Sequence, residues 1–405
     1  METPNNEPRT TNKTLACVTT ARGTGAISSI QIAGPSAKVI IKKVFAPTGG
    51  RQTDFEIGEI FVGDIFVGTR VIDRVVVGCE GENLFAINCH GNPIIVEMVM
   101  KLLKKHGAKP VGIRNMLTQQ FAPDDRPNTI ALEAKLAQLE AVTLEGVKIV
   151  ANQMRTGLAK IAGNWLENIK CLNLSDLSGR CRQIIADTEP ARLIINGCKV
   201  VIAGPPNSGK STLLNCLSGR DKAIVADTAG TTRDWVTGKC RTERLLMELV
   251  DTAGLDERLT DANEIDRKAQ KKTIDILNNC DLVLFVLDGS EKIENQEVKL
   301  NVDLLKGKKI LFVFNKRDVV QKADVSQLDI DFAASISISA KTGDRIELLV
   351  ERIREILGVS DFCLNKPVCF TQRQLELVKL LSKAKARSMA ETVIKQLLQG
   401  EITTC

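Results

Sequence analysis

The sequence predicts a multidomain α/β protein, and three patterns along the chain support this fold class. Residues 198–217 have the character of a buried strand, a glycine-rich loop and a helix, and apolar strands continue to alternate with helices as far as residue 358. Before them, short β-branched runs punctuated by glycine alternate with helical segments. Apolar residues at helical spacing fill the stretches on either side of the alternating region. We therefore expect an N-terminal α+β domain, a discontinuous helical bundle, and an inserted domain with a doubly wound, mostly parallel sheet.

The boundaries follow from where each pattern changes. The expected divisions are a disordered tail at 1–12, an α+β domain at 13–112, helices at 113–193, the inserted domain at 194–358 and further helices at 359–405. Asn128 or Thr129 is expected to cap the helical material at 131–169, which Gly157 and Gly163 are expected to interrupt. Residues 372–398 form one amphipathic helix or a pair, expected to pack against that material.

The composition narrows the class of protein. A hydrophobic fraction of 43% and a charged fraction of 26% are ordinary for a soluble globular chain. The net charge of +6 permits an RNA partner but does not require one. No apolar run reaches the length of a membrane span, and the N-terminus lacks a signal-peptide core. The 12 cysteines include no C-x-x-C pair, which argues against zinc and favours free thiols, so we expect a cytoplasmic protein without membrane association.

The stretch from Gly204 to Ser211 fits the pattern G-x-x-x-x-G-K-[ST]. In this pattern backbone N–H groups surround a nucleotide's phosphates, and the positive end of the following helix dipole faces their charge. Lys210 is expected to reach the β- and γ-phosphates, and the Ser211 hydroxyl to hold Mg²⁺. The strand before the loop and the helix after it are the context that the pattern requires.

Four further segments follow in a fixed order. A polar loop at 226–234 offers threonine hydroxyls to the Mg²⁺ shell, and a strand ending at Asp251 offers a carboxylate to Mg²⁺ through water. The Gly254 N–H is placed to sense the γ-phosphate. A strand ending at Asn315 leads to Asp318, whose carboxylate can accept two hydrogen bonds from guanine and would be left unpaired by adenine. Residues 339–341 can close over the base.

These segments together predict a guanine-nucleotide site in a Ras-like P-loop GTPase domain. The residues expected at the nucleotide are Asn207, Ser208, Gly209, Lys210, Ser211, Thr212, Ala226, Asp227, Thr228, Ala229, Gly230, Thr231, Thr232, Asp251, Thr252, Ala253, Gly254, Asn315, Lys316, Asp318, Ser339, Ala340 and Lys341.

The chain resembles the MnmE (TrmE) family of tRNA-modification GTPases on three stretches. These are residues 20–35, the His-Gly-Asn-Pro turn at 90–93, and Gly-Thr-Thr-Arg-Asp at 230–234. The resemblance implies a folate-binding-type dimerisation domain at the N-terminus and hydrolysis of GTP driven by K⁺ and by dimerisation. It further implies that Asn207, Ala226, Thr228 and Thr231 bind K⁺ and that Thr232 joins Ser211 on Mg²⁺. A glutamate of the family positions the attacking water, and here Glu264 and Asp266 are the alternatives.

The chain departs from the family pattern at several positions. The resemblance implies a site for 5-formyl- or methylene-tetrahydrofolate, where Gln31 replaces the family's arginine and Glu82 keeps its acidic position. The lysine of the family's Asn-Gly-Lys-Leu-Asp-Leu stretch has no clear match. Family members end in Cys-Ile-Gly-Lys, whereas this chain ends in Thr-Thr-Cys405, which makes it a divergent member with a truncated second helical stretch.

Two hypotheses remain open at this point. In the first, the protein is a K⁺-stimulated GTPase that acts in wobble-uridine modification of tRNA, as a homodimer in complex with an FAD-containing partner of the MnmG type. In the second, it is a GTPase switch that dimerises on nucleotide but lacks tRNA-modifying chemistry.

Overall fold

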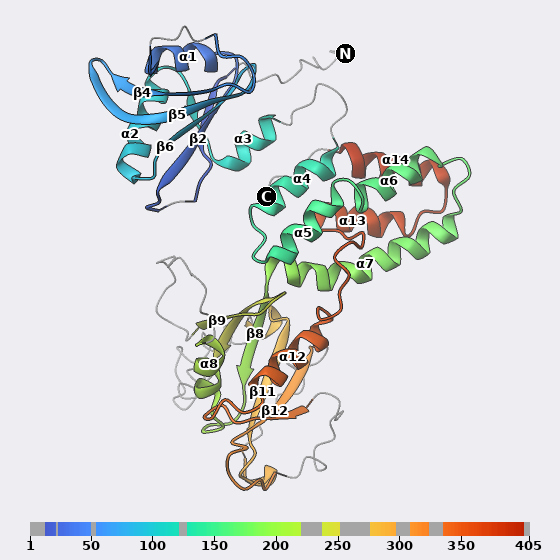
Figure 1. Cartoon of the computed structure of the whole chain (residues 1–405). Helices are drawn as coiled ribbons and strands as arrows, with labels where there is room; N and C mark the ends of the chain where they lie inside the picture. Colours follow the sequence, from blue (N-terminus) through green and yellow to red (C-terminus); the bar gives the residue numbers. More distant parts are fainter. Residues whose placement is uncertain are drawn as a thin grey trace, which may run out of the picture. The chain divides into compact units, whose positions relative to one another are not determined.

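The computed structural model describes residues 13–21, 23–49, 54–120, 128–219, 237–251, 276–296, 308–323 and 335–400 (Figure 1). The chain divides into two compact units, residues 1–127 and 128–405. Within the described ranges, no helix combines the length and the apolar character needed to cross a membrane.

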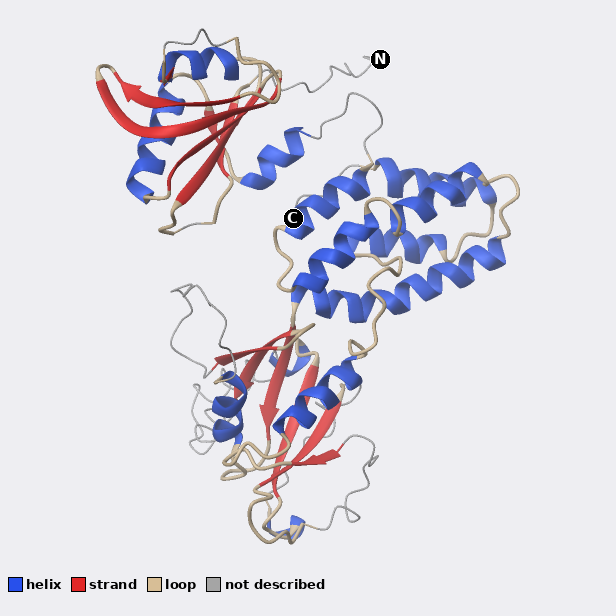
Figure 2. Cartoon of the chain, in the orientation of Figure 1, coloured by secondary structure: helices blue, strands red, loops and turns tan. Residues whose placement is uncertain are grey.

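The first unit is built on a mixed sheet with the strand order β3-β4-β5-β6-β2-β1-β7, in which only the β1–β7 pair is parallel (Figure 2). Alternating residues of β2 are buried, as expected for a strand with one covered face. Helices α1 and α2 contribute to the core on that face. The elements are β1 Leu15–Val18, β2 Ile27–Ala33, α1 Ala37–Val44, β3 Phe45–Pro47, β4 Ile60–Val67, β5 Arg70–Gly81, β6 Leu84–His90, α2 Pro93–Lys105, β7 Lys109–Pro110 and α3 Ile113–Gln120.

The helix α3 lies directly after the predicted end of the first domain at residue 112. Its Met116 is fully buried against Leu15 and Cys17 of β1, so α3 packs on the first unit. The compact units divide after Pro127, so the first unit holds α3 in addition to the residues 13–112 predicted for the first domain. Apolar periodicity identified α3 as helical but carried no information about which sheet or bundle its apolar side covers.

The second unit begins with a helical bundle assembled from both predicted stretches (Figure 2). Asn128 caps α4, and Gly157 precedes α6, whereas Gly163 lies inside α6 and does not interrupt it. Leu139 at the end of α4 and Met389 in α14 share the apolar spacing of these helices, but they are 50% and 41% exposed. The helices are α4 Thr129–Gln138, α5 Leu144–Gln153, α6 Leu158–Glu167, α7 Leu174–Asn196, α13 Gln372–Leu381 and α14 Arg387–Gln399.

The rest of this unit is an α/β domain that follows α7 almost directly. Its sheet has the order β13-β12-β11-β8-β10-β9 and is parallel except for the β9–β10 pair. One hydrophobic core runs from the ends of α5 and α7 into the face of the sheet that α8 and α12 cover. The elements are β8 Cys198–Ala203, α8 Lys210–Ser218, β9 Thr237–Arg241, β10 Leu246–Asp251, β11 Leu282–Asp288, the 3₁₀ turn η1 Ile293–Asn295, β12 Ile310–Asn315, β13 Ser335–Ser337 and α12 Ile346–Leu357.

A buried ion pair joins the two stretches of the bundle. The Glu133 carboxylate of α4 accepts two hydrogen bonds of 2.7 Å from the Arg373 guanidinium of α13 and one of 2.6 Å from Gln374. Arg373 also donates to the carbonyls of Gln396 and Leu397 near the end of α14. Residues 240 positions apart in the sequence thereby fix three helices relative to one another.

Replacing Glu133 with alanine should destabilise the bundle by about 3 kcal/mol, because the largely buried Arg373 guanidinium would lose its counter-charge. Urea unfolding followed by Trp165 fluorescence, in a Trp235→Phe background, measures this change. The matched control is Glu391→Ala, which breaks the half-exposed pair of α14 with Lys395 and should cost less than about 0.5 kcal/mol. Equal effects of the two substitutions would contradict the role given to the Glu133–Arg373 pair.

Candidate nucleotide-binding site

The loop after β8 has the backbone geometry of a phosphate cradle. Gly204 has a φ of +141°, and a Cβ at this position would lie 2.0 Å from the Val286 carbonyl oxygen, so only glycine fits. Asn207 and Gly209 also have positive φ values, and α8 begins at the next residue, Lys210. The loop therefore ends with its backbone N–H groups at a helix N-terminus, where an anion is stabilised.

Two side chains of this loop have the arrangement that a bound phosphate would use. Lys210 Nζ donates to the carbonyl oxygens of Gly204 and Pro205, at 2.8 and 2.9 Å, and thus spans the loop. The Ser208 hydroxyl is buried and finds no hydrogen-bond partner among the residues that the structure describes. A buried hydroxyl of this kind costs free energy unless a ligand satisfies it, which fits a triphosphate in the loop.

A hydroxyl and a carboxylate meet beside the cradle. Ser211 Oγ in the first turn of α8 donates to Asp251 Oδ2 at the end of β10, at 2.7 Å. Asp251 is 4% exposed. Oxygen atoms of these two types are what Mg²⁺ binds, together with water and phosphate oxygens, so the pair fits a magnesium ion at the phosphates.

The base side of the site is formed at the ends of β12 and β13. Ser339 Oγ donates to Asp318 Oδ1 at 2.7 Å, and this bond lowers the pKa of the Asp318 carboxyl. Asp318 is therefore a carboxylate at neutral pH. Its Oδ1 is held by Ser339, and the carboxylate can still accept hydrogen bonds from a ligand. Lys341, from the same turn as Ser339, adds a further favourable charge.

Asn315 connects the phosphate side to the base side. Its Nδ2 donates to the Ser208 carbonyl at 2.9 Å, and its Oδ1 accepts from the Ala340 N–H at 2.9 Å. The side chain is buried, with 3% of the residue exposed. One amide thus fixes the spacing between the phosphate cradle and the turn that faces the base.

Comparison with known proteins agrees with this geometry. The family described as "50S ribosome-binding GTPase" matches residues 199–316, and the family described as "GTP-binding protein TrmE N-terminus" matches residues 14–113. A protein of Desulforamulus reducens named "tRNA modification GTPase MnmE" is 30% identical over 84% of this chain and 81% of its own length. The chain belongs to the MnmE family.

Other relatives cover still more of the chain. The Lactococcus lactis subsp. lactis protein of the same name is 28% identical over 97% of this chain and 92% of its own length. Among solved structures, the G domain of the T. maritima FeoB iron transporter is 29% identical over 39% of this chain and 98% of its own, with a TM-score of 0.30.

Several predicted site residues of this MnmE family member lie outside the described residues. They are Ala226, Asp227, Thr228, Ala229, Gly230, Thr231, Thr232, Thr252, Ala253, Gly254, Glu264 and Asp266. The described members that hydrogen bonds join to one another are Ser208, Ser211, Asp251, Asn315, Asp318, Ser339 and Ala340. The other described members lie next to these residues in the sequence, and they are Asn207, Gly209, Lys210, Thr212, Lys316 and Lys341.

Sequence reasoning missed Asp288, the last residue of β11. Its carboxylate forms an ion pair with Lys316, and its Oδ1 accepts from the backbone N–H and hydroxyl of Ser290. Burial alone raises the pKa of Asp288, but the hydrogen bonds from Lys316 and Ser290 outweigh this effect and hold the pKa below its usual value. Asp288 therefore orients Lys316, which precedes the base-facing residues. The available signal was a carboxylate at the carboxyl end of a buried parallel strand.

The predicted folate residues Gln31 and Glu82 lie on different segments of the first unit. Gln31 Nε2 of β2 donates to Glu80 Oε2 of β5 at 2.8 Å, while Glu82 lies exposed in the turn between β5 and β6. His90, the first residue of the His-Gly-Asn-Pro turn, ends β6 with its ring exposed and its Nδ1 2.6 Å from Asp73 Oδ1. The strand register thus makes Glu80 the acidic neighbour of Gln31.

Replacing Asp318 with asparagine should shift nucleotide preference from guanine to xanthine, with a loss of GTP affinity of about a hundredfold or more. The side-chain NH₂ of the introduced asparagine would face the N–H donors of guanine and could not bond to them. Xanthine has a carbonyl oxygen in place of the guanine amino group, and this oxygen can accept from the NH₂. Competition between GTP and XTP for a fluorescent nucleotide measures the preference, with the exposed Asp361→Asn as control. Unchanged guanine selectivity would remove Asp318 from the base site.

Proposed function

We propose that this protein hydrolyses GTP, with Mg²⁺ and K⁺ bound, in the modification of the wobble uridine of tRNA. The observation that carries the proposal is the convergence of a glycine-rich phosphate cradle, the Ser211–Asp251 pair and the Asp318–Ser339 pair at the carboxyl ends of adjacent parallel strands. The chain belongs to a family whose members are named tRNA modification GTPases, and this supports a role in tRNA modification.

On the phosphate side, the chain contributes positioning and positive charge. The backbone N–H groups of the loop bind phosphate oxygens, and Lys210 exchanges its two carbonyl partners for the β- and γ-phosphates. Ser211, and Asp251 through water, would hold Mg²⁺, and the ion would supply positive charge that offsets the charge of the phosphates. The Ser208 hydroxyl gains the partner that it lacks among the described residues.

On the base side, the chain contributes selectivity. Asp318 accepts from the Watson–Crick edge of guanine, while Lys316, held by Asp288, flanks the base. Asn315 keeps the turn at 339–341 at a fixed distance from the phosphate cradle, so base and phosphates are recognised together.

We further propose that a K⁺ ion stimulates hydrolysis. Asn207 is exposed in the cradle and has a φ of +60°. We assign its amide oxygen to the ion. Ala226, Thr228 and Thr231 would complete the ion's shell, and Glu264 or Asp266 would position the attacking water. K⁺ supplies positive charge near the bond between the β- and γ-phosphates.

The remaining parts of the proposal concern partners and compartment. We propose a homodimer that acts in the cytoplasm with an FAD-containing partner of the MnmG type and with tRNA. The first unit, which matches the TrmE N-terminal family, would provide the dimerisation domain. If folate binds, Gln31 and its neighbour Glu80 are the side chains that would face it, and Glu82 would approach from the turn.

Exchanging KCl for NaCl should slow GTP hydrolysis at least about tenfold, because the smaller ion fits the same oxygen shell poorly. Asn207→Ala should remove the difference between the two salts and leave the slow rate. Phosphate release at saturating GTP measures the hydrolysis rate in each salt for both proteins. Asn215→Ala, in the helix α8 that follows the loop, is the matched control. Equal rates of the unmodified protein in the two salts would contradict a K⁺ site.

A further inference from the structure

Two turns of the helical bundle meet at one end and carry basic side chains. Arg387 at the start of α14 donates through Nε to the Leu172 carbonyl in the α6–α7 turn, at 3.1 Å. Ser178 of α7 donates to the Ser382 carbonyl in the α13–α14 turn, at 2.7 Å. The α6–α7 and α13–α14 turns are therefore neighbours, although about two hundred residues separate them in the sequence (Figure 1).

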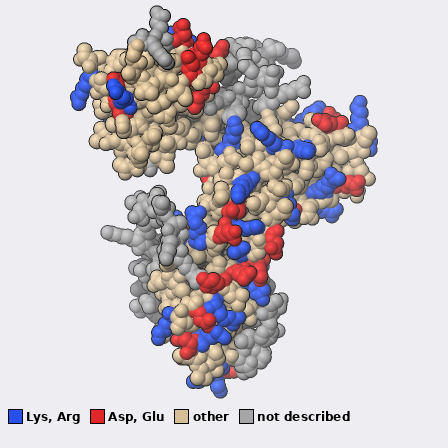
Figure 3. All heavy atoms as spheres, viewed as in Figure 1, with Lys and Arg blue, Asp and Glu red and all other residues tan. Residues whose placement is uncertain are grey.

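The charge at this end is strongly one-sided. Residues 168–182 and 379–390 contain a single acidic side chain, Asp176, and the following basic ones: Lys170, Arg180, Arg182, Lys379, Lys383, Lys385 and Arg387. All seven basic residues are exposed, and none of them forms an ion pair with any residue in the described part of the chain. Figure 3 shows Lys and Arg side chains distributed over the visible face of the bundle, with Asp and Glu side chains at several places among them. We call Lys170, Lys383, Lys385 and Arg387 the basic end.

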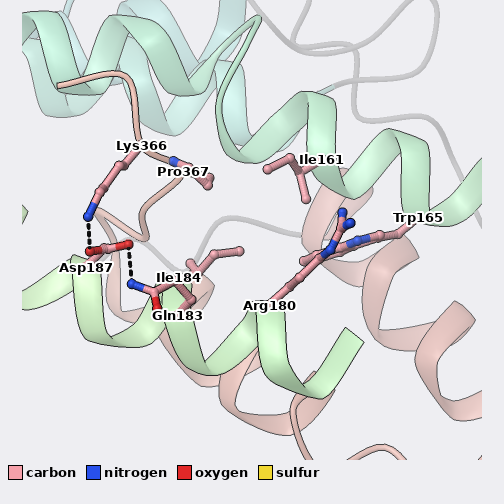
Figure 4. Close-up of a pocket in the computed structure, with 8 residues that line it drawn as sticks. All are labelled: Ile161, Trp165, Arg180, Gln183, Ile184, Asp187, Lys366 and Pro367. Carbon is pink, nitrogen blue, oxygen red and sulfur yellow. Dashed lines mark hydrogen bonds and ion pairs between the residues drawn. The ribbon is translucent and has the colours of Figure 1, made fainter. Parts of the chain in front are cut away.

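A cavity of about 350 Å³ lies between α6, α7 and the segment before α13, and Arg180, one of the seven basic residues, lines it (Figure 4). Ile161, Ile184, Pro367 and the Trp165 ring give it apolar walls. Trp165 lies in the last turn of α6, and Arg180 lies about 9 Å along α7 from its start, so this end of the cavity faces the α6–α7 turn. The other end, at Asp187, lies about 20 Å along α7.

The polar groups of the cavity lie at its two sides. On one side Asp187 accepts from Lys366 at 2.7 Å and from Gln183 at 2.9 Å. On the other side is Arg180, next to Trp165 (Figure 4). An apolar slot of this size with an amide, a carboxylate and a guanidinium at its edges suits a flat heteroaromatic ring that carries donors and acceptors.

We infer that the basic end and the cavity form one surface that binds single-stranded RNA, with phosphates on the basic end and an unstacked base in the cavity. This inference rests on the proposed function, which requires contact with tRNA, and it assigns that contact to the helical bundle. A row of unpaired cations matches the phosphodiester backbone, and RNA loops are recognised through bases taken out of the stack. In a fully paired RNA helix the phosphates can contact the basic end, but every base stays in the stack and none can enter the cavity.

The test uses the full chain and a fluorescent RNA hairpin with an unpaired loop, compared with a closed duplex of the same stem. Lys170→Ala/Lys383→Ala/Lys385→Ala should weaken hairpin binding about tenfold or more. It should also lower the slope of log affinity against log salt by about two, since each lost phosphate contact in a single strand removes about 0.7. Arg180→Ala/Gln183→Ala should remove most of the preference for hairpin over duplex.

The control Lys148→Ala/Lys239→Ala/Lys292→Ala makes the same change in net charge at exposed lysines elsewhere in this unit. If this control variant weakens RNA binding as much as the triple substitution at the basic end does, the inference is wrong. The inference is also wrong if the triple substitution at the basic end leaves RNA binding unchanged. GTP hydrolysis measured on the same samples reports correct folding. Hydrolysis without hairpin binding by the unmodified chain would overturn the inference alone, whereas hairpin binding through the basic end without GTP hydrolysis would support it and contradict the proposed function.

Discussion

The side-chain amide of Asn315 is the interaction on which the nucleotide site depends. It is buried, and it uses its donor on the phosphate cradle and its acceptor on the turn after β13. Hydrogen bonds in a buried site are strong, and the loss of one partner leaves the other unsatisfied. The separation between the phosphate-facing and base-facing parts is therefore set by a single side chain, and a ligand must match both parts at once to bind well.

The parallel sheet makes this connection possible. The register of β8, β11, β12 and β13 brings their carboxyl ends to one edge, where the cradle, Asp288, Asn315 and Ser339 all lie. The core beneath continues from the sheet into α5 and α7, so the site rests on well-packed elements. Lys210, which spans the loop through two carbonyls, can keep the cradle in shape until phosphate oxygens replace those carbonyls.

Local sequence patterns were enough to predict the strand–loop–helix at the phosphate cradle, the fold class and the amphipathic helical character of residues 372–398, but not whether these residues form one helix or two. They work because backbone propensity, glycine positions and apolar periodicity act over a few residues. Contacts that depend on register were not predictable in this way. Asp288 meets Lys316, Gln31 meets Glu80 and Glu133 meets Arg373 only after strands and helices have packed, and α3 joined the first unit for the same reason.

The most direct measurement of the central claim is nucleoside mass spectrometry of tRNA from source cells that lack this gene, complemented with the unmodified chain or with Lys210→Ala. If GTP hydrolysis at this site serves tRNA modification, the substituent on the wobble uridine disappears on deletion. The substituent should return when the cells are complemented with the wild-type protein. It should stay absent with the Lys210→Ala variant, which lacks the cation expected at the β- and γ-phosphates. Wobble uridine that remains fully modified after deletion, with no second copy of the gene in the genome, would contradict the account.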